Sequence, residues 1–167
     1  FIFMPPLRIA FITTDALLPY VRSHRQPLFT HDDQLLADEL DRRGHTVVPW
    51  VWHGPAPSPT PDVALMRSPW DYATQPDAFF QFLDALETSG IRVVNPLQTI
   101  RENLDKRYLV RLHHAGASVV PTLLIPKNSP DANLRSWIAR TGWPEIIVKP
   151  VVSGGAYHTY RLPEADA

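Results

Sequence analysis

Four short apolar segments in the first 95 residues alternate with more polar stretches, and this order constrains the fold more than any other feature. The segments are rich in the β-branched and aromatic residues of buried strands, and they cover residues 7–13, 46–52, 62–66 and 91–94. Helical patterns follow the first and the third, so the order strand, helix, strand, strand, helix, strand predicts a small open α/β sheet with at least some parallel pairing. Pro49 predicts an edge position for the second strand, because proline has no N–H to donate.

Two helices are predicted in this first part of the chain. Thr30 precedes Asp32 and Asp33, a pattern typical of a capped helix start, and Gly44 ends the helix. Simple capping is the favoured interpretation of both carboxylates. The second helix ends at Gly90, and its apolar face recurs at helical spacing: Phe79, Phe82, Leu83 and Leu86.

A second domain is predicted over residues 96–167, after a first domain over residues 4–95. Thr99 and Glu102 form a capping-box pattern, which predicts one helix as far as Gly116. Its expected core stripe consists of Ile100, Leu104, Tyr108, Leu112 and Ala115.

The remainder of this domain is predicted to contain a helix and a hairpin. Ser129 and Pro130 predict the start of the helix, which Gly142 ends. A strand over residues 145–152 is expected to turn back into residues 156–162.

Composition excludes several classes of function. The formal charge of −1 argues against a nucleic-acid partner, which usually requires a basic excess. The chain has no cysteine, so thiolate metal sites and cysteine nucleophiles are excluded. No apolar run of 18 residues predicts a membrane segment, and a cytoplasmic location is expected. His113 and His114 are adjacent and point to different sides of a helix, so the histidines predict no metal site.

Two lysines lie where a phosphate could be bound. Lys149 ends a buried-looking strand and precedes Ser153, Gly154 and Gly155, a turn whose backbone amides could approach a phosphate closely. Lys106 is expected in the middle of the predicted helix. The alternatives remain open: a plain hairpin with a solvated lysine, and a solvated helix face.

A second group of candidates follows the predicted strands of the first domain. Arg67 and Asp71 flank a Ser-Pro-Trp turn at the carboxyl end of a strand, where open α/β sheets bind ligands. The guanidinium could bind a substrate carboxylate and Asp71 an amine; the alternative is an Arg67–Asp71 pair that fixes the loop. Asp15 follows the first strand in the equivalent location and is a weaker candidate. No residue is assigned a catalytic role.

Several short motifs together resemble the ATP-grasp superfamily. In chain order they are Asn95-Pro96, Asn103 with Asp105-Lys106, Gly116, Val120-Pro121-Thr122, Val148-Lys149-Pro150 and Ser153-Gly154-Gly155. The stretch over residues 65–72, LMRSPWDY, is similar to the branch that contains the cyclo-ligase closing O-ureido-D-serine to D-cycloserine. The similarity runs from about residue 7 to residue 161.

The resemblance implies a small Rossmann-like pre-ATP-grasp domain followed by the first α+β subdomain of an ATP-grasp lid. It also implies a carboxylate–amine ligase or an intramolecular cyclo-ligase, with ATP and Mg²⁺ as cofactors and an acyl-phosphate intermediate. Lys106 and Lys149 would contact the phosphates, and residues 153–155 would fold over them. In this superfamily the magnesium ligands come later, so they are expected beyond Ala167; the lid is then truncated and this portion alone is expected to be inactive.

Two other classes of function are alternatives to the ligase. A dinucleotide-binding oxidoreductase should carry a glycine-rich turn after its first strand, but residues 13–30 contain no glycine. A non-catalytic module that binds a nucleotide or a small molecule remains the alternative. The expected partner is a small amino-acid-like carboxylate, while a homodimer and the role of residues 17–29 are left open.

Overall fold

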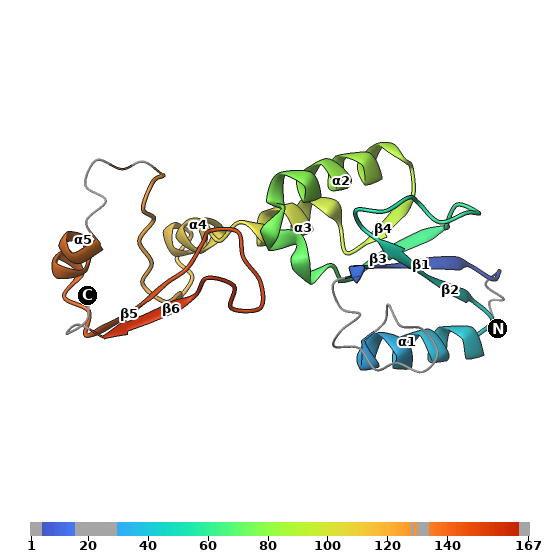
Figure 1. Ribbon diagram of the computed structural model, residues 1–167, viewed down its shortest axis with the longest axis horizontal. Coiled ribbons are helices and arrows are strands. Elements are labelled where there is room, and N and C mark those ends of the chain that lie inside the picture. Colours follow the sequence, from blue (N-terminus) through green and yellow to red (C-terminus); the bar gives the residue numbers. More distant parts are fainter. Residues whose placement is uncertain (1–4, 16–29, 128, 130–133, 164–167) are drawn as a thin grey trace. The chain divides into compact units, whose positions relative to one another are not determined.

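A four-stranded parallel sheet with the order β2-β1-β3-β4 forms the centre of the N-terminal part of the chain (Figure 1). Its strands are β1 (Arg8–Thr13), β2 (Thr46–Val51), β3 (Val63–Ser68) and β4 (Arg92–Val94). All three neighbouring pairs are parallel, and β2 with Pro49 lies at an edge, so both predictions are confirmed.

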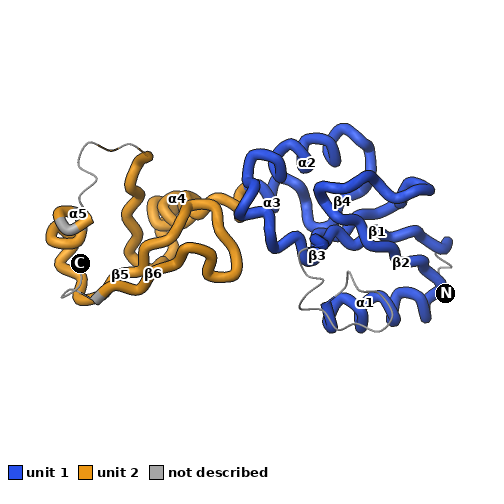
Figure 2. Tube along the Cα trace, viewed as in Figure 1, with its two compact units in different colours: residues 1–101 blue, residues 102–167 orange. Residues whose placement is uncertain are grey.

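The computed structural model describes residues 5–15, 30–127, 129 and 134–163. Figure 2 shows that the chain divides into two units, residues 1–101 and residues 102–167. The expected cap residue Pro130 and all of residues 17–29 lie outside the described residues. None of the described helices combines the length and the hydrophobicity that a bilayer crossing requires.

The sheet is buried on both faces, which explains why the sequence of β1 is almost continuously apolar. Figure 1 shows helix α1 (His31–Arg42) on one face and helix α2 (Pro76–Thr88) on the other. Ile9 and Phe11 form a cluster with Ala37 of α1. On the opposite face, Phe79 of α2 packs against Trp52 just after β2, with 5.1 Å between the ring centroids.

Helix α1 begins with the cap that the sequence predicts, and this cap is a capping box. The Thr30 side chain accepts a hydrogen bond from the backbone N–H of Asp33, and the Asp33 side chain accepts one from the backbone N–H of Thr30. Gly44, at φ +88°, follows the helix in the left-handed region that glycine adopts without strain.

The prediction of one helix between Thr99 and Gly116 is wrong, because the structure has two helices. They are α3 (Leu97–Leu104) and α4 (Tyr108–His114), and Lys106 lies in the break between them. Of the expected core stripe, Leu104 is buried, whereas Leu112 and Ala115 are exposed.

Three contacts explain the break. Asp105 forms an isolated antiparallel bridge with Val152, and the backbone N–H of Lys106 donates to the carbonyl of Val151 at 2.8 Å. The Asp105 carboxylate also accepts from the backbone N–H of Arg107 at 2.9 Å, a local bond that competes with helical pairing.

The second unit also contains helix α5 (Leu134–Thr141) and an antiparallel hairpin of β5 (Glu145–Val148) and β6 (Tyr160–Pro163). The hairpin is confirmed, but β5 ends four residues earlier than the predicted strand. Pro150 has no backbone N–H to donate to β6, and Val152 pairs with Asp105 instead. The pairing with β6 therefore ends at Val148.

Candidate ligand-binding site

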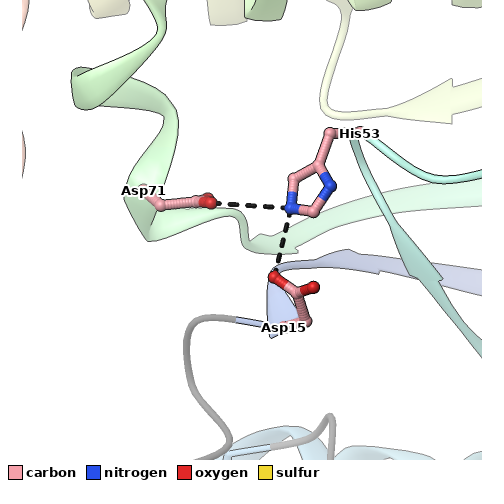
Figure 3. Close-up of side chains that lie close together, drawn as sticks. All are labelled: Asp15, His53 and Asp71. Atoms are coloured by element: carbon pink, nitrogen blue, oxygen red, sulfur yellow. Dashed lines mark ion pairs between the residues drawn. The ribbon is translucent and has the colours of Figure 1, made fainter.

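The carboxyl ends of β1, β2 and β3 meet at one edge of the sheet, because the strands are parallel neighbours. Asp15 follows β1, His53 follows β2, and Asp71 lies in the short 3₁₀ helix η2 (Trp70–Thr74) that follows β3. His53 Nε2 is 3.2 Å from Asp15 Oδ1 and 3.7 Å from Asp71 Oδ2. Figure 3 shows both carboxylates directed at the same ring nitrogen.

This cluster is fixed on one side and open on the other. Trp52 Nε1 donates to Asp71 Oδ1 at 2.7 Å, which holds that carboxylate with its second oxygen toward His53. The Asp71 side chain is 17% exposed, whereas that of Asp15 is 54% exposed. The structure therefore brings together two predicted residues, Asp15 and Asp71, and adds His53. The sequence carried one signal for His53, its position two residues after a strand that ends at this edge.

Arg67 is placed away from Asp71. Its Nε donates to Asp33 Oδ1 at 2.6 Å, and its guanidinium carbon lies 5.9 Å from the centre of the Phe11 ring. Ser68 Oγ donates to the other Asp33 oxygen at 2.6 Å. The Arg67–Asp71 pair that the sequence left open is thus replaced by an Arg67–Asp33 pair.

Asp33 does more than cap α1, since its buried carboxylate joins the helix to the end of β3. Burial raises the pKa of Asp33, but hydrogen bonds from Ser68, Arg67 and Thr30, with the charge of Arg67, outweigh burial and hold the pKa below its ordinary value.

We expect this carboxyl to contribute to acid sensitivity. A depressed pKa in the folded state stabilises the fold above the pKa of the unfolded chain, about 3.9, and that stabilisation is lost as the pH falls through the folded value. The free energy of unfolding in urea, measured between pH 6 and pH 2, should therefore decrease on the acid side. Asp33→Asn should flatten this decrease, and an unchanged pH profile would contradict the assignment.

In the second unit, the structure brings Lys106 next to the serine–glycine turn. Lys106 Nζ donates to the carbonyl oxygen of Ser153 at 2.6 Å. Burial lowers the pKa of Lys106, and the positive charge of Lys149 lowers it further, while Asp105 partly opposes both. The two ammonium groups therefore lie near enough to repel each other.

The serine–glycine turn has free space beside one of its glycines. Ser153 is buried, and Gly155 has φ +56°, with no atom within 4 Å of where a Cβ would stand. The structure thus places Lys106 against the predicted turn and leaves open space beside Gly155. Gly154 lies between Ser153 and Gly155, and its carbonyl accepts from the backbone N–H of Tyr157 at 2.9 Å.

The first unit is a Rossmann-like α/β domain with polar side chains at the carboxyl edge of its parallel sheet, the arrangement of a ligand-binding α/β protein. The chain belongs to the family described as the N-terminal domain of D-cycloserine synthetase DcsG, whose model matches residues 9–95.

A known protein sequence and a solved structure, both named DcsG, show the same relationship. The cycloserine biosynthesis protein DcsG of Streptomyces lavendulae is 33% identical over 91 residues, which are 53% of this chain and 30% of that protein. The crystal structure of D-cycloserine synthetase DcsG superposes with a TM-score of 0.78 at 25% identity, covering 95% of this chain and 51% of that chain. The chain thus spans about a third of the curated relative and about half of the crystallised one.

Proposed function

We propose that this chain is the N-terminal part of an ATP-dependent ligase that activates a small amino-acid-like carboxylate as an acyl phosphate. An amine-type nucleophile, from a second molecule or from the same one, then attacks the activated carbonyl. The observation that carries the proposal is the pair of neighbouring ammonium groups, Lys106 and Lys149, beside the turn of Ser153, Gly154 and Gly155.

A multiply charged anion fits this pair. The positive charge of Lys149 is one cause of the lowered pKa of Lys106, and a negative group near both lysines would offset that repulsion. The carboxylate that acts on Lys106 is that of Asp105, and it is held by Arg107, whose Nε donates to Asp105 Oδ2 at 2.8 Å. Because the Asp105 carboxylate is already paired with Arg107, it only partly compensates the positive charge of the lysines. The phosphates of a bound nucleotide would supply the remaining negative charge.

In this proposal each residue has a binding role. Lys106 and Lys149 bind phosphate oxygens and stabilise the negative charge that accumulates during phosphoryl transfer. The backbone N–H groups of residues 153–155 contact the phosphates, as those of glycine-rich turns do. When bound, ATP with Mg²⁺ supplies the phosphoryl group that makes the carboxylate reactive.

The relatives support a biosynthetic ligase. One is named a cycloserine biosynthesis protein and the other a D-cycloserine synthetase. An intramolecular ring closure is therefore one form of the reaction that we propose here. Arg67, Asp71 and Asp15 remain the proposed substrate-binding residues of the first unit.

The product distribution of the natural full-length protein tests the acyl-phosphate step. With ATP, Mg²⁺ and a panel of small amino acids, we expect release of ADP and phosphate that depends on the acid. Added hydroxylamine should trap the activated acid as a hydroxamate. Release of AMP and pyrophosphate would contradict the proposal, because it indicates an adenylate. ATP binding without turnover on any acid would instead favour a binding module.

A further inference from the structure

We propose that Asp15, His53 and Asp71 form a binding site for one divalent transition-metal ion of the zinc class at the carboxyl edge of the parallel sheet. The site lies wholly within the first unit. It uses Asp15 and Asp71, two of the residues proposed to bind the substrate, so the ion would take part in that binding; its test requires no ligase activity. Among the described residues, no other three metal-ligating side chains bring their ligand atoms this close together.

The spacing of the three ligand atoms fits a tetrahedral ion. Bonds of about 2.0–2.1 Å at tetrahedral angles separate neighbouring ligand atoms by about 3.3–3.4 Å. The measured distances from His53 Nε2 to the two carboxylates, 3.2 Å and 3.7 Å, lie on either side of that value. All three ligand atoms lie within 4.8 Å of one another. An ion can therefore enter with small side-chain movements.

The types of ligand select the class of ion. One imidazole nitrogen with two carboxylate oxygens suits Zn²⁺ and its neighbours, whereas Mg²⁺ and Ca²⁺ prefer oxygen ligands alone. A neutral His53 binds through Nε2, so the ion takes the place of a proton between the ring and the carboxylates. The two carboxylates balance the charge of a divalent ion.

Neighbouring side chains hold the cluster as the residues around known metal sites hold the metal ligands. The indole N–H of Trp52 holds one oxygen of Asp71, which orients the other oxygen toward His53. The Trp52 ring also contacts the His53 ring edge to face, with 5.1 Å between centroids. Each ligand follows a different strand, so the rigid sheet fixes their separation. Three protein ligands leave a fourth position for water or for an oxygen atom of a ligand.

Zinc titration of the metal-free protein tests the site. With a chromophoric chelator as competitor, we expect one tightly bound Zn²⁺ per chain and at least hundredfold weaker binding of Mg²⁺. Asp71→Asn keeps an acceptor for Trp52 but removes the charge, and it should weaken Zn²⁺ binding at least tenfold. Asp15→Asn, at an exposed side chain, should do the same without disturbing the fold, as circular dichroism would show.

His53→Ala should abolish the tight site, whereas His113→Ala in the second unit should leave it unchanged. Anomalous diffraction from a zinc-soaked crystal should place the ion within bonding distance of His53 Nε2. The proposal is overturned if the wild-type protein binds no Zn²⁺, or if tight binding survives both His53→Ala and Asp15→Asn, because the ion then lies elsewhere.

Discussion

Lys149→Ala should lower ATP turnover by the natural full-length protein about a hundredfold to a thousandfold, the loss seen when one donor to a developing negative charge is removed. Lys149 lies just after β5 and is exposed, so its removal should leave the fold of the second unit intact. The same substitution should raise the pKa of Lys106, because the charge of Lys149 is one cause of its depression. Nuclear magnetic resonance of the lysine side chains can follow that change without any substrate.

Lys127→Ala is the matched control. The chain contains only three lysines. Lys127 is exposed, as Lys149 is, but it takes no part in the proposed phosphate site. It should retain full turnover. Equal losses for Lys127→Ala and Lys149→Ala would indicate a general effect of charge. Full turnover by Lys149→Ala would remove this residue from the mechanism.

The regular elements of the first unit were predictable because local patterns decide them. The apolar runs, the proline at the edge strand and the helix cap at Thr30 each act within a few residues, and each was confirmed. Parallel pairing also followed, because a helix separates β1 from β2 and another separates β3 from β4.

The break at Lys106 was not predictable from local patterns. Residues 99–116 have an uninterrupted helical pattern, and the partner that interrupts it is Val152, which is distant in sequence. This long-range pairing places Lys106 against the carbonyl of Ser153. The geometry of the candidate phosphate site therefore depends on the helix break at Lys106, which a long-range contact causes and the local sequence pattern does not show.

The side-chain partners in the first unit were only partly predictable. The topology of a parallel sheet places Asp15, His53 and Asp71 at one edge, so their proximity could have been inferred from the strand ends. The pairing of Arg67 with Asp33 could not be inferred from the sequence, because it depends on where the first turn of α1 lies against the end of β3.

Asp33→Ala should lower the free energy of unfolding by about 2–4 kcal/mol, because it removes charge-assisted hydrogen bonds and half of a helix cap, while the one-third-exposed Arg67 side chain can be solvated. The Asp33 side chain is 1% exposed, and it accepts hydrogen bonds from Arg67 Nε and Ser68 Oγ, both at 2.6 Å. Alanine leaves both donors without this acceptor and also removes half of the capping box of α1. Chemical denaturation at pH 7 measures the loss.

Asp32→Ala provides the comparison within the same helical turn. Its side chain is exposed and contributes mainly through the helix dipole, so the loss should be at most about 1 kcal/mol. Adding Arg67→Met to Asp33→Ala should recover part of the lost stability, because no unpaired guanidinium then remains against the Phe11 ring. If Asp33→Ala lowers stability no more than Asp32→Ala does, then Asp33 acts only as a cap, and the link between α1 and the end of β3 contributes nothing.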